Sequence, residues 1–547
     1  MSQSTTKSQG TTTSPDTTTS PDTTSQTTHA SASVAAILAE SATRFPDDVA
    51  IVVGPQSITY AELWQQTKAY AGALAARGVG EGTKVAMLVP NVADFPRVYY
   101  AVLALGGVAV PIHALLKRHE IEYVLNDSGT SLLVCAAPLL AEGAAGAELA
   151  GVDVVTVLAP DDESAARHDR LEALAATAEP IVTYRSRDPF STATILYTSG
   201  TTGQPKGAEG SHYSLIEQVN TNLMTTFDMT RGDRVLGALP LFHTFGQTCT
   251  MNTALRAGAT VVMVPKFDGD TALRVMVENE CGIFMGVPTM YMALLDAATR
   301  TDDRPPLRYA ISGGASLPVA IIERFESVFQ APIHEGYGLT ETSPVATFNH
   351  VGLPPRPGTI GTPVWGVDVE IADSAVGDAI VLLPHGEIGE IVVRGHNIMN
   401  GYLNRPEDTA RAIVDGWFRT GDLGTKDDDG YLRVVDRTKD MIIRNGYNVY
   451  PRQVEEVLAT HPDVTMAAVF GVPHEVHGQE IEAAVVLRAG AEVTPEQLIA
   501  YVSDEIAAYK YPRVVHVLDA LPLGPSGKVL KRELVATFTQ EAAPTTA

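Results

Sequence analysis

The sequence predicts an α/β protein with a large multi-lobed N-terminal domain, built of α/β layers plus a β-rich subdomain, and a small α+β C-terminal domain. From residue 31 onward, short apolar runs alternate with amphipathic stretches, as in VAMLVP at 85–90 and VAVPIH at 108–113. Such alternation is typical of strands buried between helices. Over about 364–395 the rhythm changes to short β-like runs separated by glycines, which predicts the β-rich subdomain.

The remaining elements follow the same logic along the chain. Strand-like apolar runs return at 132–138, 235–243 and 259–267. After about residue 440 a new compact unit begins, with a helix-like segment at 451–461 and strand-like segments at 465–473 and 482–490. We therefore expect a domain boundary near 436–440.

Length and composition exclude a single small module and a disordered protein. The chain has 547 residues, of which 45% are hydrophobic and 19% are charged, so most of it can bury a core. Residues 1–30 are the exception, because they are rich in serine and threonine and repeat TTTSPD. This segment cannot bury enough apolar surface to offset the entropy of ordering, so we expect a disordered tail.

Charge and cysteine usage limit the partners and the compartment. Lys and Arg number 39 against 64 Asp and Glu, a net charge of −25, which argues against nucleic acid or anionic lipid as a partner. The three cysteines lack CxxC spacing, which fits a reducing compartment. No apolar run is long enough for a membrane span, so we expect a cytoplasmic protein without stable membrane insertion. The sequence leaves the oligomeric state open between monomer and homodimer.

The sharpest motif is YTSGTTGQPKG at 197–207. Its glycines and hydroxyl residues give a loop whose N–H and O–H groups can converge on the oxygens of a polyphosphate, and Lys206 adds a positive charge. The Walker A pattern is absent, because Pro205 stands where its second glycine belongs and Gly207 follows the lysine. The motif therefore disfavours a P-loop kinase or ATPase and predicts another kind of anion cradle. The residues expected to contact the nucleotide here are Thr198, Ser199, Gly200, Thr201, Thr202, Gly203 and Lys206.

This loop resembles the phosphate loop of the adenylate-forming superfamily, which contains acyl-CoA synthetases, luciferases and peptide-synthetase adenylation domains. Four further motifs follow in the order that the family has, so the resemblance covers residues 31–535. It implies ATP, Mg²⁺ and coenzyme A as cofactors. It also implies an N-terminal AMP-binding domain over 31–436, a hinge at 437–440 and a mobile C-terminal domain over 441–547.

The second motif is EGYGLTET at 335–342. A phenol flanked by glycines suits stacking on a purine, and a hydroxyl with a carboxylate suits a phosphate and a hard Mg²⁺ ion. By resemblance, Tyr337 stacks on adenine, Thr340 contacts the α-phosphate and Glu341 is the magnesium ligand. The neighbouring residues expected around the nucleotide are Glu335, Gly336 and Gly338, with Gly313, Gly314 and Ala315 as a pocket wall beside adenine.

The third and fourth motifs are WFRTGDLG at 417–424 and DRTKD at 436–440. A carboxylate in a glycine-flanked turn can accept both hydroxyls of a ribose, and the resemblance assigns that role to Asp422. In the hinge, it makes Arg437 a ribose or phosphate contact and Lys439 the residue about which the C-terminal domain turns. After rotation, Gly446 and Tyr447 are expected to line the tunnel for the pantetheine arm of CoA.

The fifth motif is LPLGPSGKVLKR at 521–532. A single lysine in such a loop is ordinarily a surface residue, but the resemblance makes Lys528 the adenylation lysine. Its compact ammonium group can bridge the substrate carboxylate and the α-phosphate as their charges meet. A further segment, LPLFHTFG at 239–246, resembles the part of the family beside the acyl pocket, so His243 is expected near the carboxylate.

The resemblance implies an ATP-dependent carboxylic acid–CoA ligase that acts on a medium- or long-chain fatty acid through an acyl-adenylate. An aryl-acid CoA ligase is one alternative, and a stand-alone ligase that loads a carrier protein is another. A luciferase-type oxidase would use the same motifs. A nucleotide-binding regulator could dispense with Lys528 and Glu341, so the presence of both favours an enzyme.

Overall fold

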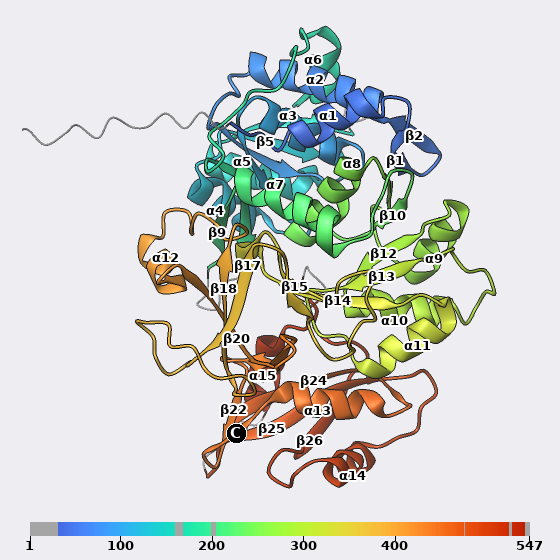
Figure 1. The fold of residues 1–547 in the computed structure, drawn as a ribbon, viewed down its shortest axis with the longest axis vertical. Coiled ribbons are helices and arrows are strands. Elements are labelled where there is room, and N and C mark those ends of the chain that lie inside the picture. Colours follow the sequence, from blue (N-terminus) through green and yellow to red (C-terminus); the bar gives the residue numbers. More distant parts are fainter. Residues whose placement is uncertain (1–30, 159–167, 199–203, 475, 525–527, 542–547) are drawn as a thin grey trace, which may run out of the picture.

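The computed structural model describes residues 31–158, 168–198, 204–474, 476–524 and 528–541 (Figure 1). The predicted α/β architecture is confirmed: a large N-terminal part contains two mostly parallel sheets and an antiparallel sheet, and a small C-terminal part contains a fourth sheet. In Figure 1 the small part lies at the end of the molecule opposite the first helices of the chain. Within the described ranges, no helix has the length and hydropathy needed to cross a membrane.

The first sheet has seven strands in the order β7-β6-β5-β3-β4-β8-β9. The runs predicted at 85–90, 108–113 and 132–138 form its buried strands β3, β4 and β5, which run parallel. The strands are β3 (Lys84–Leu88), β4 (Val108–Pro111), β5 (Leu132–Ala136), β6 (Asp153–Val157), β7 (Asp169–Arg170), β8 (Thr192–Thr198) and β9 (Lys206–Ser211). The associated helices are α2 (Tyr60–Ala76), α3 (Asp94–Ala104), α4 (Arg118–Ser128), α5 (Leu140–Ala150) and α6 (Leu171–Thr177).

The second sheet has nine strands in the order β16-β15-β14-β13-β12-β10-β11-β1-β2. They are β1 (Val49–Val53), β2 (Gln56–Thr59), β10 (Arg234–Gly237), β11 (Thr260–Met263), β12 (Ile283–Gly286), β13 (Tyr309–Ser312), β14 (Ile333–Gly338), β15 (Val345–Phe348) and β16 (Thr362–Pro363). The helices beside it are α1 (Ala36–Arg44), α7 (His212–Thr221), α8 (Thr253–Ala257), α9 (Gly269–Glu278), α10 (Pro288–Ala297) and α11 (Val319–Phe329). A π-helical segment, η4 (Phe245–Asn252), and a short 3₁₀ turn, η5 (Thr340–Thr342), lie close to the strand ends. Strands from β1 to β14 in this sheet pair in parallel except for the edge strand β2.

The predicted β-rich subdomain is an antiparallel sheet that extends beyond the segment from which it was predicted. It contains β17 (Val367–Ala372), β18 (Gly389–Gly395), β19 (Ile413–Val414), β20 (Trp417–Lys426) and β21 (Leu432–Arg437), with α12 (Pro406–Ala412) beside it. The ribose motif lies in β20, and β21 ends at the first residue of the expected hinge.

The C-terminal part has its own apolar core, in which Val454, Leu458, Val469 and Val502 are fully buried. Its strands are β22 (Ile442–Arg444), β23 (Tyr447–Val449), β24 (Val464–His474), β25 (Gly478–Leu487) and β26 (Val514–Val517). Its helices are α13 (Pro451–Thr460), α14 (Pro495–Glu505) and α15 (Lys531–Glu541). A separate core is what allows a small unit to move as a body. We call this unit the small lobe and residues 31–436 the large lobe.

The turn between β14 and β15 can form only because Gly338 has no side chain. A Cβ atom at this position would lie 1.8 Å from the carbonyl oxygen of Pro344, and backbone atoms cannot yield as a flexible side chain can. The turn carries Thr340 and Glu341, so the glycine fixes the position of two expected site residues.

We therefore predict that Gly338→Ala destabilises the large lobe by more than about 1 kcal/mol, because either the β14–β15 pairing or the turn must shift. Thermal unfolding monitored by circular dichroism would show the lower midpoint. Gly80→Ala is the matched control, since a Cβ there meets nothing within 4 Å. Equal midpoints for the two variants would contradict the prediction.

Candidate active site

Loops from both lobes converge on one small, partly open cavity of about 20 Å³. In the large lobe these loops follow β10, β12 and β13 and lead into η4, so the cavity lies at the carboxyl ends of parallel strands, where ligands bind in open α/β sheets. The small lobe contributes the segment before α15. The lining residues are Leu239, Pro240, His243, Phe245, Gly246, Val287, Gly314 and Lys528.

A larger and more open hollow, of about 520 Å³, lies elsewhere on the large lobe. Thr83 and Ser131 line it just before β3 and β5, so it is at the amino ends of these strands. None of the expected site residues lines it. We therefore assign the site to the smaller cavity, despite its size.

Among the described residues that line the cavity, Lys528 is the only lysine or arginine. Gly314 has φ +82°, a left-handed conformation that favours glycine, and a Cβ there would be in ordinary contact with Val287 at 3.5 Å and with Cε of Lys528 at 4.0 Å. Burial and the charge of Arg437 together lower the pKa of Lys528 to about 8, against the raising effects of Asp422 and Glu341. Because burial without a bound anion disfavours the ammonium form, this lysine is suited to a site that receives negative charge.

His243 lies at the large-lobe side of the same cavity. Its Nδ1 accepts the backbone N–H of Phe245 at 3.2 Å, so a neutral ring carries its proton on Nε2. Burial lowers the pKa of His243 to about 4, and the nearby charge of Lys528 acts in the same direction. A neutral imidazole that donates from Nε2 can hydrogen-bond a carboxylate without adding charge to the cavity.

The predicted adenine and ribose residues lie in direct contact. The hydroxyl of Tyr337 donates to Oδ2 of Asp422 at 2.6 Å, and Nε of Arg437 lies 3.3 Å from Oδ1 of the same carboxylate. Gly336 is required beside them, because a Cβ there would lie 2.6 Å from the ring of Phe348. Tyr337 and Asp422 are 85 positions apart along the chain, and Asp422 and Arg437 are 15 positions apart. The structure brings all three together.

The expected magnesium ligand is held in place by a residue that the sequence did not indicate. Glu341 accepts a hydrogen bond from the hydroxyl of Tyr402 at 2.8 Å. The same tyrosine ring lies 5.2 Å from the ammonium of Lys206, which also pairs with Asp408 at 2.8 Å. Tyr402 and Asp408 belong to a segment without a recognised motif. Their place in the site is seen only from their contacts with Glu341 and Lys206. The predicted contact of Lys206 with phosphate oxygens stays a prediction.

The phosphate loop is only partly described. Thr198 ends β8 and Lys206 begins β9, and these two residues face each other in the antiparallel pair. The loop is therefore anchored at both ends on the sheet. The expected phosphate contacts Ser199, Gly200, Thr201, Thr202 and Gly203 lie outside the described residues.

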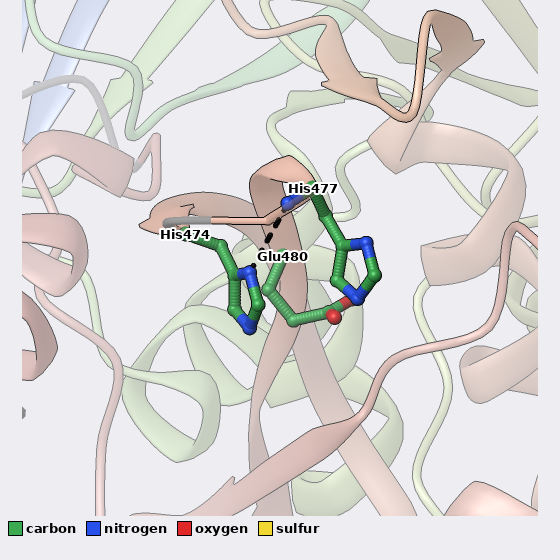
Figure 2. Close-up of side chains that lie close together, drawn as sticks. All are labelled: His474, His477 and Glu480. Atoms are coloured by element: carbon green, nitrogen blue, oxygen red, sulfur yellow. Dashed lines mark hydrogen bonds between the residues drawn. The ribbon is translucent and has the colours of Figure 1, made fainter.

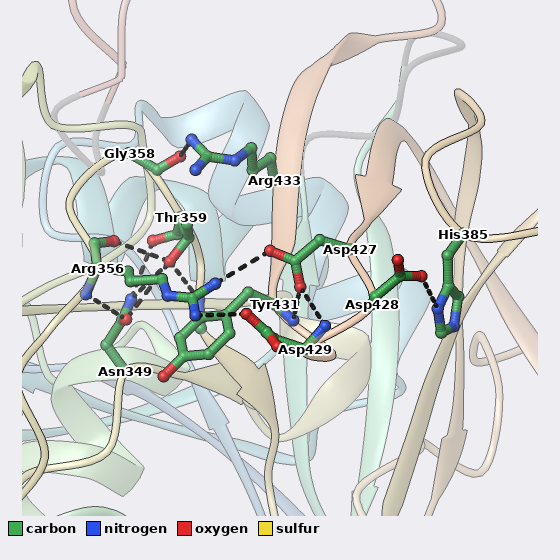
Figure 3. A network of polar contacts seen from close by, with 11 residues as sticks. Asn349, Arg356, Gly358, Thr359, His385, Asp427, Asp428, Asp429, Tyr431 and Arg433 are labelled. Atoms are coloured by element: carbon green, nitrogen blue, oxygen red, sulfur yellow. Dashed lines mark hydrogen bonds and ion pairs between the residues drawn. The ribbon is translucent and has the colours of Figure 1, made fainter.

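Glu335 lies between the adenine motif and a polar network that supports the next loop. Its Oε2 accepts the N–H of Gly358 at 3.3 Å, and burial raises its pKa to about 7. Figure 3 shows the network beyond this point: Arg356 pairs with Asp427 at 3.2 Å and with Asp429 at 2.7 Å. The guanidinium also lies 4.0 Å from the centroid of the Tyr431 ring. These contacts fix the 349–361 loop against the antiparallel sheet.

Of the expected site residues that the structure describes, His243, Gly314 and Lys528 line the cavity. Lys439 is exposed between β21 and β22, Gly446 lies in the turn between β22 and β23, and Tyr447 begins β23. Tyr447 is 58% exposed, and its ring contacts Tyr509 of the same lobe. Their predicted roles concern a second orientation of the small lobe, so these roles stay predictions.

One other group within the described ranges has metal-ligand chemistry: His474, His477 and Glu480, at the β24–β25 turn (Figure 2). Several of their donor atoms are already engaged. Nδ1 of His474 accepts the N–H groups of Val476 and His477, each at 3.2 Å, and the carboxylate of Glu480 pairs with Arg444 at 2.6 and 3.0 Å. We interpret this group as a brace for the hairpin.

Comparison with known proteins identifies the class. The chain belongs to the AMP-binding enzyme family: the family profile matches residues 38–403, and the profile of the AMP-binding enzyme C-terminal domain matches residues 453–528.

Among named relatives, a long-chain-fatty-acid–CoA ligase of Bacillus subtilis is 33% identical, with 92% of this chain and 94% of the relative covered. A feruloyl-CoA synthase of Amycolatopsis is 36% identical, with 90% and 96% covered. The crystal structure of ATP-bound MatB from Rhodopseudomonas palustris is similar with a TM-score of 0.84 and 33% identity, covering 93% of this chain and 99% of that one.

Because the pKa of Lys528 is lowered to about 8, the ammonium form is lost as the pH rises through that value. We predict that kcat/KM for acyl-adenylate formation falls about tenfold per pH unit above this pKa. Lys528→Arg should move this alkaline limb to higher pH, since a guanidinium keeps its proton. A pH profile of acid-dependent ATP–pyrophosphate exchange measures the position of this alkaline limb. If the limb stays at the same pH in Lys528→Arg, another group is titrating.

Proposed function

We propose that the protein is an AMP-forming acid–CoA ligase that converts a carboxylic acid into an acyl-adenylate and then into a CoA thioester. The observation that carries the proposal is the position of Lys528, which reaches from the small lobe into a cavity that also contains His243 and Gly314. The two relatives named as CoA ligases support the same activity. A cytoplasmic location is part of the proposal and is supported by Cys135, Cys249 and Cys281, which are buried free thiols.

In the first half-reaction a carboxylate oxygen attacks the α-phosphorus of ATP, and the bond from that phosphorus to pyrophosphate breaks. Lys528 neutralises the two anions as they approach, and the Nε2–H of His243 orients the carboxylate. Tyr337 and Asp422 would hold adenine and ribose. Glu341 offers a carboxylate that fits Mg²⁺, which when bound would supply charge neutralisation at the pyrophosphate oxygens, and Thr340 would contact the α-phosphate.

In the second half-reaction the thiol of CoA attacks the carbonyl carbon of the mixed anhydride, the thiol loses its proton, and AMP leaves. Lys528 occupies the cavity in the present orientation, so it must withdraw before the thiol can arrive. A rotation of the small lobe about Lys439, within the proposed hinge at 437–440, would withdraw it. The same rotation would bring the exposed turn at Gly446 and Tyr447 toward the acyl group.

For the acid, we propose a medium- or long-chain fatty acid, with an aryl acid as the second candidate. The cavity wall is mostly apolar, formed by Leu239, Phe245 and Val287, which suits either class. The aryl candidate is favoured by the Phe245 ring, which lines the cavity beside Gly313 and could pack against an aromatic acid.

The role of Lys528 gives a selective prediction. Lys528→Ala should lose most acyl-adenylate formation from acid and ATP but should still pass preformed acyl-adenylate to CoA, because only the first step needs the cation at the junction of the two anions. Rapid quench with labelled ATP measures the first step, and thioester formation measures the second. Lys510→Ala is the matched control, since Lys510 bonds Gln453 within the small lobe. An equal fall in both half-reactions would refute the assignment.

The substrate class is tested by supplying short, medium, long and aromatic acids, each with and without CoA. We expect pyrophosphate release with an apolar acid and acyl-CoA formation only when CoA is present. Acyl-adenylate without acyl-CoA would indicate a ligase that loads a carrier protein, and no pyrophosphate with any acid would indicate a nucleotide-binding regulator. Phe245→Ala should lower the rate with an aromatic acid more than the rate with a straight-chain acid if the aryl alternative holds.

A further inference from the structure

Helix α13 of the small lobe is capped by a residue of the large lobe. The residue before the helix, Tyr450, makes no side-chain cap. Instead the backbone N–H of Arg452 donates to Oδ2 of Asp436 at 3.0 Å. Asp436 lies in β21 and is only 6% exposed. A carboxylate at this place satisfies an N–H that the helix leaves unpaired and is attracted to the positive end of the helix dipole.

Two cations of the small lobe reinforce this contact. The guanidinium of Arg452 donates to the carbonyl oxygen of Val434 in β21 at 2.6 Å. The ammonium of Lys531 pairs with Glu455 of α13 at 2.7 Å, and its charge also acts on Asp436. Asp436 thus faces the first turn of α13 and the start of α15 together.

Lys531 links the contact at Asp436 to the position of Lys528. It begins α15, three residues after Lys528. The position of α15 therefore sets where the Lys528 segment enters the cavity. If α13 left Asp436, the start of α15 would move with it, because Glu455 binds Lys531.

We propose that Asp436 is a positioning residue for acyl-adenylate formation: its carboxylate holds α13 and the Lys528 segment against the large lobe, and this contact breaks when the small lobe rotates. The effect on acyl-adenylate formation rests on the proposed function, whereas the contact itself rests on the hydrogen bonds between the lobes.

The contact is suited to opening in every turnover. Burial raises the pKa of Asp436, against the lowering effects of Lys531 and of the N–H groups of Arg452 and Arg437. Glu455 also faces the carboxylate and raises its pKa further. The cost of removing the carboxylate from water therefore offsets much of the attraction, so the net hold is small and reversible.

The test compares Asp436→Ala with Thr494→Ala. Thr494 caps α14 of the same lobe by accepting the N–H of Gln497 at 3.3 Å, so both variants remove one helix cap but only the first removes a contact between lobes. Asp436→Ala should slow acid-dependent ATP–pyrophosphate exchange about 5- to 30-fold. Thioester formation from preformed acyl-adenylate should be unchanged or faster. Thr494→Ala should change neither rate.

A conservative variant distinguishes loss of this contact from misfolding. Asp436→Asn keeps an oxygen that can accept the N–H of Arg452 but loses the charge, so it should slow the exchange in the same direction and by a smaller factor. Equal losses in both half-reactions, or the same loss in Thr494→Ala, would overturn the proposal, since a structural role alone would produce them.

A second measurement does not depend on activity. Arg437 and Lys439 are exposed trypsin sites between the lobes. Limited trypsin digestion should cut there faster in Asp436→Ala than in the wild type, and at the wild-type rate in Thr494→Ala. Unchanged cleavage in Asp436→Ala would overturn the proposed contact. If the wild type shows no exchange with any acid, the proposed function fails, whereas the cleavage rates still decide whether Asp436 joins the lobes.

Discussion

The rest of the site depends on one interaction between the lobes. The ammonium group of Lys528, from the small lobe, enters a cavity of the large lobe. The charge of Lys528 is costly in that cavity, as its lowered pKa shows. The carboxylates of Asp422 and Glu341 offset part of this cost, and negatively charged substrates would offset more of it. A protein with a net charge of −25 needs such a local cation to bind ATP and a carboxylate.

The other ionisable groups of the site are paired with one another. Asp422 accepts from Tyr337, Glu341 accepts from Tyr402, and Lys206 pairs with Asp408. These contacts keep each side chain in one orientation while no ligand is present. Preorganisation of this kind lowers the entropy that binding must remove, and each partner can move aside when a stronger ligand oxygen replaces it.

The sequence predicted the fold class and the residues of compact motifs, because a buried strand, a glycine turn or a loop lysine leaves a local pattern. The roles of Tyr337, Asp422 and Lys528 were predicted because the motifs around them resemble those of the adenylate-forming superfamily, and the structure brings Tyr337 to Asp422 and Lys528 to His243. Tyr402 bonds Glu341, which is 61 positions away, and Asp408 pairs with Lys206, which is 202 positions away. The capping role of Asp436 depends on Arg452, which is 16 positions away. Pairings of this kind are set by tertiary packing, which no local pattern records.

The register of the β8–β9 hairpin has a consequence for variation in the phosphate loop. Thr198 and Lys206 face each other across an antiparallel pair, and successive side chains of a strand point to opposite faces. Adding or deleting one residue in the strand pairing would turn Lys206 away from Asp408 and Tyr402. A one-residue shift of this pairing would therefore separate the Lys206 ammonium from both of its partners, whereas the register in the structure keeps it on their side of the sheet.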